Sequence, residues 1–136
     1  MKSKKPILLV EDDRVDVMTI ERALKDIKVT NTLNVVKNGE EALEFLRNKK
    51  NEKPCLILLD LNMPRMNGIE FLKIAKRDDD LKLLPAIVLT TSKEEQDKMN
   101  SFQLGVAGYM LKPVDYKQFL EVIRAIDLYW TLSELP

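Results

Sequence analysis

Short apolar runs alternate along the chain with longer segments that carry apolar residues at helical spacing. Five runs predict strands at residues 7–10, 33–36, 55–59, 86–89 and 109–111. Three of these runs, ILLV, CLILL and AIVL, are apolar at every position, which is typical of strands buried on both faces of a parallel sheet. The sequence therefore predicts a sheet covered by helices on both sides.

A helix-start signal follows each of the five apolar runs. A small polar residue is followed three positions later by a polar or acidic one, as in a capping pair. The pairs are Asp13 with Asp16, Asn38 with Glu41, Asn67 with Glu70, Ser92 with Glu95, and Asp115 with Gln118. Three of the following segments predict stripes that face the core. These stripes are Val17, Ile20, Leu24 and Ile27, then Met99, Phe102 and Val106, and finally Phe119, Ile123, Ile126 and Trp130.

Strict alternation of five strands and five helices predicts an α/β fold with a parallel sheet and right-handed crossovers. For a (βα)5 doubly wound, flavodoxin-like sheet the expected strand order is 2-1-3-4-5. We expect one domain over residues 1–136, with no separate output domain and an apolar C-terminal tail at about residues 130–136. In such sheets ligands bind beyond the carboxyl ends of the strands at the switch point, here strands 1 and 3.

Composition and charge exclude several classes of function. The chain has 22 Lys and Arg against 22 Asp and Glu, so it lacks the basic field that holds a protein on nucleic acid or an anionic membrane. Only four apolar residues, 7–10, precede Glu11, too few for a signal peptide or a membrane span. We therefore expect a cytoplasmic protein with no nucleic-acid or membrane partner. The single cysteine, Cys55, is expected to be buried packing.

The absence of histidine removes Ser-His and Cys-His catalysis and His-ligated metal sites, which leaves carboxylates, hydroxyls and lysines. Carboxylates follow both strands at the switch point. The first strand leads into Glu11, Asp12 and Asp13, and the third ends at Asp60. Clustered carboxylates repel one another unless a cation is bound, and Mg²⁺ prefers such oxygen ligands. The pattern predicts a magnesium site.

The other strand ends supply groups that suit a phosphate. The fourth strand ends in Thr90, Thr91 and Ser92, which offer hydroxyl donors, and the fifth ends in Lys112 before Pro113. We interpret the whole edge as a phosphate-handling site.

Taken together these residues resemble the CheY-like receiver domain of bacterial two-component response regulators, over residues 6–129. The resemblance rests on the acidic cluster, the segment DLNMPRMNG at 60–68, Thr90, Gly108-Tyr109 and Lys112-Pro113. Further features, namely Asp16, the LTTS segment at 89–92, Val114 with Phe119, and the tail from Tyr129-Trp130 to Leu135-Pro136, look like stand-alone regulators that partner phytochrome-type sensor histidine kinases.

The resemblance implies that Asp60 is the phosphoacceptor, which attacks the phosphoryl group of a phosphohistidine on a partner sensor histidine kinase. Glu11 and Asp12 match the acidic pair that holds Mg²⁺, and Asn62 matches the position that lends its backbone carbonyl to the metal. Asp13 remains an alternative metal ligand, although we expect it to cap the first helix.

Three further residues take roles by resemblance. Lys112 would neutralise charge on the phosphoryl oxygens, Thr90 would move to bond one of them, and Tyr109 would turn inward behind it. The resemblance also implies a cis peptide bond between Lys112 and Pro113.

Other functions agree less well with these residues. A flavodoxin needs a phosphate loop after the first strand, where three carboxylates would repel a phosphate. A haloacid-dehalogenase-type phosphatase needs a second aspartate two residues after the nucleophile, where this chain has Asn62. A pseudo-receiver, a docking module without phosphorylation, remains the alternative.

We expect a signalling switch rather than an enzyme with an external product, with at most slow self-dephosphorylation. Its output would be a homodimer formed through the fourth helix, fifth strand, fifth helix and tail, because this region carries more apolar side chains than one sheet face needs. The alternative is that the tail folds back on its own domain, since scattered exposed apolar residues are normal. The surplus residues are Leu120, Leu128, Trp130, Leu132 and Leu135.

Overall fold

A computed structural model describes residues 3–133 of the chain. Strands and helices alternate throughout: β1 (Ile7–Val10), α1 (Arg14–Asp26), β2 (Leu33–Val36), α2 (Gly39–Arg47), β3 (Leu56–Leu59), α3 (Gly68–Ala75), β4 (Ala86–Thr90), α4 (Glu95–Gln103), β5 (Gly108–Leu111) and α5 (Tyr116–Leu132). All the strand pairings are parallel, in the order β2-β1-β3-β4-β5. The predicted fold class and strand order are confirmed.

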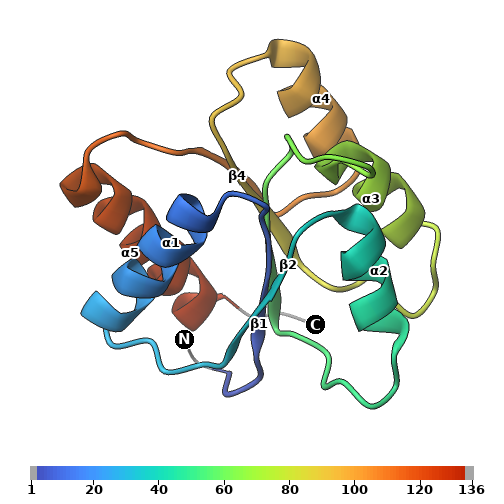
Figure 1. The fold of residues 1–136 in the computed structure, drawn as a ribbon, viewed down its shortest axis with the longest axis horizontal. Coiled ribbons are helices and arrows are strands. Elements are labelled where there is room, and N and C mark those ends of the chain that lie inside the picture. The colour runs from blue at the N-terminus through green and yellow to red at the C-terminus, as the bar shows by residue number, and fades with distance from the viewer. Residues whose placement is uncertain (1–2, 134–136) are drawn as a thin grey trace.

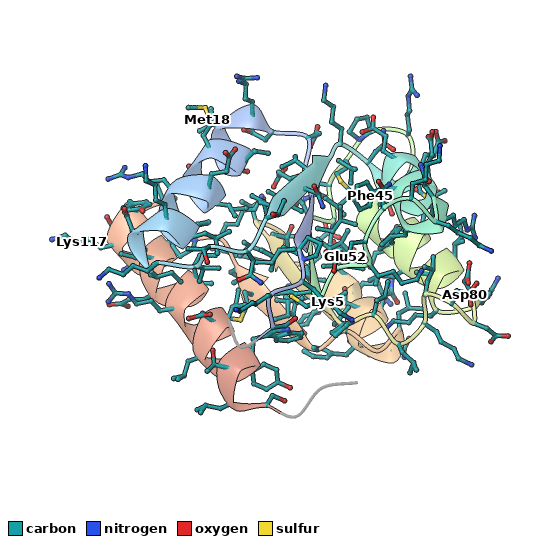
Figure 2. The ribbon with its side chains drawn as sticks, turned by 90° about the horizontal axis from the view of Figure 1, so that it is seen from below. Lys5, Met18, Phe45, Glu52, Asp80 and Lys117 are labelled. Carbon is teal, nitrogen blue, oxygen red and sulfur yellow. The ribbon has the colours of Figure 1, made fainter. Side chains whose placement is uncertain are left out.

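The sheet separates two hydrophobic cores, with α1 and α5 on one face and α2, α3 and α4 on the other (Figure 1). Side chains alternate between the faces of a strand, so Leu8 and Val10 of β1 pack toward α2 and α3, whereas Ile7 and Leu9 pack toward α1 and α5. Side chains of the solvent face of the helices, such as Met18 of α1 and Lys117 of α5, point away from the sheet (Figure 2).

Three of the five predicted helix caps are confirmed. The side chains of Asp13, Asn38 and Asn67 accept hydrogen bonds from backbone N–H groups at the start of α1, α2 and α3, and Asn67 forms a full capping box with Glu70. Asp115 occupies the N-cap position of α5 without a side-chain hydrogen bond to the helix.

The cap predicted at Ser92 is wrong, because α4 begins only at Glu95. Glu94 takes the N-cap position. The Ser92 hydroxyl instead donates to Asp97 Oδ2, 2.7 Å away within α4. The serine therefore ties the β4–α4 loop to the helix rather than capping its first turn.

The predicted stripes differ in outcome. In α5, Phe119, Ile123, Ile126 and Trp130 are all buried, as expected. In α1, Ile20 and Leu24 are buried, and Val17 and Ile27 pack against them half-buried.

The stripe predicted on α4 is wrong. Met99 is 53% exposed and Phe102 52% exposed, whereas Ser101 is buried. The chain leaves the helix after Gln103 and turns at Gly105, which has a φ of 79°. The buried Val106 is therefore not on the same helical face, and the spacing of the three residues did not reflect one helix.

Two smaller expectations need correction. Cys55 is half-buried and precedes β3, and its Sγ lies 3.6 Å from the carbonyl oxygen of Lys5 at the amino end of the sheet. The tail expected from residue 130 begins later, because α5 continues to Leu132 and Trp130 packs in the core. Residues 134–136, including Leu135, lie outside the described residues. Within the described chain, the helices are too short or too polar to cross a bilayer.

Candidate functional site

Three carboxylates meet at the carboxyl edge of the sheet. Oxygen atoms of Glu11, Asp12 and Asp60 all lie within 4.8 Å of one another. The sheet causes this, because Val10 and Leu59 are partners in register and the N–H of Asp60 donates to the carbonyl of Val10 at 3.0 Å. Glu11 and Asp60 are buried, whereas Asp12 is exposed. The switch point therefore gathers carboxylates as the sequence predicts.

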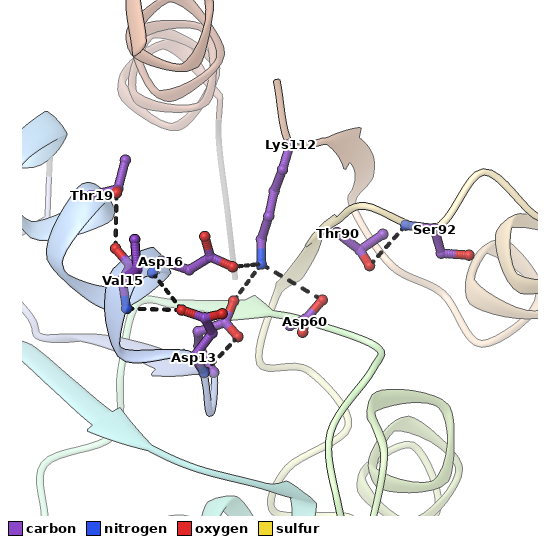
Figure 3. Close-up of polar contacts among 9 residues, drawn as sticks. Asp13, Val15, Asp16, Thr19, Asp60, Thr90, Ser92 and Lys112 are labelled. Carbon is purple, nitrogen blue, oxygen red and sulfur yellow. Dashed lines mark hydrogen bonds and ion pairs between the residues drawn. The ribbon is translucent and has the colours of Figure 1, made fainter. Parts of the chain in front are cut away.

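Lys112 enters this cluster from the end of β5 (Figure 3). Its ammonium is in direct ion-pair contact with Glu11, lies 2.9 Å from Asp16 Oδ2, and lies 3.8 Å from Asp60 Oδ1. The lysine side chain is only 6% exposed. One buried cation thus faces several carboxylates.

The peptide bond between Lys112 and Pro113 is trans, since the described residues contain no cis peptide bond. The expectation of a cis bond is wrong. The trans form is the more stable one by about 0.5–1 kcal/mol. The lysine still reaches the cluster, and its backbone N–H donates to the carbonyl of Thr90 at 2.8 Å.

Burial dominates the electrostatics of the cluster. Desolvation raises the pKa of Glu11 to about 7, even though its hydrogen bond with Lys112 lowers it, and the charge of Asp60 raises it further. Desolvation also raises the pKa of Asp60, against the opposing effect of Lys112. Burial lowers the pKa of Lys112, but hydrogen bonds to Glu11 and Asp16 outweigh this and raise it overall. The carboxylates carry more negative charge than one lysine offsets, which suits a divalent cation.

Asp13 lies next to this cluster but has a different partner. Its Oδ1 accepts hydrogen bonds from the backbone N–H groups of Val15 at 2.8 Å and Asp16 at 3.1 Å. Its carboxylate is not among the three that converge. This geometry favours capping of α1 as the role of Asp13.

The loop after β3 packs closely on Asp60. Backbone groups of Leu61 and Asn62 hydrogen-bond to the Asp60 carboxylate and lower its pKa. A Cβ on Gly68 would lie 2.6 Å from the Asp60 carbonyl oxygen, so only glycine allows α3 to begin this close to the aspartate. The side chain of Asn62 is exposed, and the role expected for its carbonyl stays a prediction.

Thr90 and Tyr109 lie on the side of the site toward α4. Thr90 is fully buried, and a hydrogen bond from its side chain lowers the pKa of Asp60. Its Oγ1 also accepts from the backbone N–H of Ser92 at 3.3 Å. Tyr109 is half-buried and donates its hydroxyl to the Ser92 carbonyl at 3.0 Å. Ser92 thus links the two residues expected to switch.

Sequence reasoning missed the contact between Asp16 and Lys112. The sequence pattern pairs Asp16 with Asp13 at the start of a helix, and Asp16 is also one feature of the resemblance. The only local signal was that Asp16 lies in the first turn of the helix that follows the acidic cluster. The partner of Asp16 could not be read from the chain, since Lys112 is 96 residues away.

Comparison with known proteins places this geometry in a family. The family model for the response regulator receiver domain matches residues 7–124. Response regulator Rcp1 of Synechocystis sp. is 36% identical over 130 residues, which cover 93% of this chain and 88% of Rcp1. The polar-differentiation response regulator DivK of Brucella anthropi is 32% identical over 121 residues, 89% of this chain and 94% of DivK.

Solved structures agree with this assignment. The phosphorylated cyanobacterial phytochrome response regulator RcpA superposes with a TM-score of 0.87 at 37% identity, covering 98% of both chains. The Mn²⁺-bound form of Rcp1 superposes with a TM-score of 0.89 at 35% identity, covering 98% of this chain and 99% of Rcp1. The chain therefore belongs to the response regulator receiver domain family, whose members are CheY-like signalling switches.

Proposed function

We propose that the chain is a single-domain response regulator that accepts a phosphoryl group on Asp60, with Mg²⁺, from a partner histidine kinase. One observation carries the proposal. In a chain of the receiver family, Asp60 lies beside two further carboxylates, Glu11 and Asp12, and 3.8 Å from the ammonium of Lys112. We also propose that residues 1–136 form one receiver domain.

Glu11, Asp12 and Asp60 would hold the magnesium ion, with the backbone carbonyl of Asn62. Their crowding supports the assignment, because burial raises the pKa of both Glu11 and Asp60 and leaves their charge poorly compensated. The Mn²⁺-bound structure of Rcp1 supports a divalent cation in such a protein. When bound, the ion would offset negative charge on the phosphoryl oxygens.

The chemical step is nucleophilic attack by a carboxylate. An oxygen of Asp60 would form a bond to phosphorus while the bond from phosphorus to the donor imidazole nitrogen breaks, and the imidazole nitrogen keeps the electron pair. Lys112 would stabilise the charge on the transferred group through its ammonium, which is already within the site. Hydrolysis of the acyl phosphate by the chain itself would be slow at most.

Thr90 and Tyr109 would carry the signal away from Asp60. Thr90 is buried and hydrogen-bonds Asp60, so its hydroxyl is placed to follow a phosphoryl oxygen. Tyr109 is joined to the same loop through Ser92. A shift of this loop would alter α4 and β5 together.

A phytochrome-type sensor histidine kinase is the partner we propose. Support comes from similarity to RcpA, which is described as a phytochrome response regulator, and to RtBRR, described as a bacteriophytochrome response regulator and 40% identical over 98% of this chain. We place the protein in the cytoplasm, and fractionation of cells with an antibody to the chain tests that location.

Output through a homodimer fits the exposed apolar side chains of α4, β5 and α5. These are Met99, Phe102, Leu111, Leu128, Tyr129 and Leu132. Two residues that were expected to add to this surface do not: Trp130 is buried, and Leu120 packs half-buried against the core between the sheet and α1 and α5. A two-fold contact would use the same patch on both copies.

The test is incubation of the full chain with Mg²⁺ and acetyl phosphate, followed by mass spectrometry of reduced or trapped peptides. We expect one modified residue, Asp60, and no modification in D60N or without Mg²⁺. A chain that stays unmodified by acetyl phosphate and by a phosphorylated histidine kinase would instead be a pseudo-receiver, which docks without phosphorylation.

A further inference from the structure

Asp16 is a carboxylate that touches the site without joining the acidic cluster. Its Oδ2 lies 2.9 Å from Lys112 Nζ, whereas Asp60 Oδ1 lies 3.8 Å from the same atom, beyond hydrogen-bonding distance. The described structure thus holds the ammonium nearer to Asp16 and Glu11 than to the residue proposed to carry the phosphoryl group.

The position of Asp16 is fixed by the start of α1. Its backbone N–H donates to the capping side chain of Asp13 at 3.1 Å, so the carboxylate projects from the first helical turn toward β5 (Figure 3). Its side chain is 37% exposed, so the contact with the almost buried Lys112 stands at the boundary between solvent and site. Asp16 can therefore restrain the ammonium without being buried itself.

The carboxylates that contact Lys112 differ in whether they could also bind a cation. Glu11 and Asp60 belong to the group of three carboxylates that could hold a cation, and Asp16 does not. A cation would draw Glu11 and Asp60 toward itself, and Asp16 would remain as the carboxylate that competes for Lys112. The negative charge of Asp16 also disfavours a second anion on that side of the lysine.

We propose that Asp16 is a positioning residue. Its ion pair keeps the Lys112 ammonium at a distance from Asp60 and so lowers the affinity of the site for a phosphoryl group. The inference rests on the proposed function, since it assumes that a phosphoryl group binds at Asp60. It adds a control of that binding by a residue in the first turn of α1.

The experiment measures binding of BeF₃⁻, a phosphoryl mimic, to the full chain at saturating Mg²⁺ by ¹⁹F NMR. D16N and D16S remove the charge, D16E keeps it, and E21Q removes one charge from an exposed position of the same helix. We expect D16N and D16S to bind BeF₃⁻ about two- to fivefold more tightly, the scale of a partly exposed ion pair. D16E and E21Q should bind like the unaltered chain.

Titration of Mg²⁺ alone separates positioning from a general change in the fold. We expect D16N and D16S to leave Mg²⁺ affinity unchanged or slightly weaker while BeF₃⁻ binds more tightly. Unchanged or weaker BeF₃⁻ binding in both variants would overturn the inference, as would loss of folding in both. Failure of the unaltered chain to bind BeF₃⁻ would instead reject the proposed function, and this inference with it.

Discussion

Tyr109 donates its hydroxyl to the backbone carbonyl of Ser92 across 3.0 Å, which joins β5 to the loop that follows Thr90. The Ser92 N–H in turn lies 3.3 Å from Thr90 Oγ1, and its hydroxyl is bonded to Asp97 of α4. A displacement of Thr90 therefore has a direct hydrogen-bonded route to both α4 and β5.

Removal of the tyrosine hydroxyl tests this route. We expect Y109F to lower the free energy of unfolding by about 1 kcal/mol, the usual value of one hydrogen bond, and to reduce any effect of BeF₃⁻ on self-association. Urea unfolding and sedimentation with and without BeF₃⁻ measure the two effects. Y116F is the control, since it removes a tyrosine hydroxyl that donates to Asp26 Oδ2, away from the loop after Thr90. An equal effect on self-association in this variant would contradict the role of Tyr109.

Removal of a carboxylate from the cluster should stabilise the protein without metal. D60N removes a carboxyl group whose pKa is raised by burial, which means that its charged form is costly in the folded state. The melting temperature of D60N in EDTA should therefore exceed that of the unaltered chain. D79N, at an exposed surface aspartate, is the control and should change little. A lower melting temperature of D60N in EDTA would show that Asp60 is not crowded by its neighbours.

Magnesium should stabilise the unaltered chain through preferential binding to the folded state. When the free Mg²⁺ concentration is a hundred times the dissociation constant, the free energy of unfolding should rise by about 2.7 kcal/mol. D60N should lose most of this increase. Differential scanning calorimetry across a Mg²⁺ series measures this gain. The same stabilisation in D60N would place the cation elsewhere.

The two exposed aspartates after β1 should differ in their effect on metal binding. We expect D12N to weaken Mg²⁺ at least about tenfold, as loss of a metal-site group does. D13N should leave Mg²⁺ affinity nearly unchanged, because the asparagine can still accept the N–H groups of Val15 and Asp16. Isothermal titration calorimetry compares them, and a tenfold loss in D13N alone would exchange the two roles.

The stability of the metal-free protein should depend on pH through Glu11. Its pKa is about 7 in the folded chain against an ordinary value of 4.5. Between pH 4.5 and pH 7 the folded state therefore binds a proton at Glu11 that the unfolded state has lost. Stability from this group is fully present below pH 4.5 and is lost as the pH rises through 7, at up to about 1.4 kcal/mol per pH unit.

The variant E11Q isolates this effect. We expect E11Q to gain stability relative to the unaltered chain as the pH rises from 5 to about 8, and the gain should shrink when Mg²⁺ is present. Urea unfolding at several pH values measures the difference between the two proteins. A difference that does not change with pH would contradict the raised pKa of Glu11.

Charge on the exposed face of α5 should prevent the proposed dimer. Leu128 is 59% and Leu132 74% exposed, so L128E and L132E should lower dimer affinity at least about tenfold without unfolding the chain. L83E alters another exposed leucine, at 67%, in the α3–β4 connection, and serves as the control. A monomer under every condition, in sedimentation with and without BeF₃⁻, would end the dimer proposal.

The sequence by itself determined the fold and the chemistry of the strand ends. Uninterrupted apolar runs such as residues 7–10 and 86–89 are typical of strands that are buried on both faces of a sheet. Their alternation with helices restricts the sheet to a few possible topologies. Because parallel strands end at one edge, the order of residues along the chain was enough to group Glu11, Asp12, Asp60, Thr90 and Lys112. Local caps at Asp13, Asn38 and Asn67 were readable because they involve neighbours three residues apart.

Only the tertiary structure decided which partner each of these groups takes. The contact of Lys112 with Asp16 joins residues 96 positions apart, and the burial that raises the pKa of Glu11 depends on every strand around it. The buried stripe on α4 and the cis bond before Pro113 were predicted wrongly. The stripe rested on residue spacing alone, and the cis bond rested on resemblance to the family. Periodicity records which residues avoid water, whereas pairing and protonation depend on the distances that the whole fold imposes.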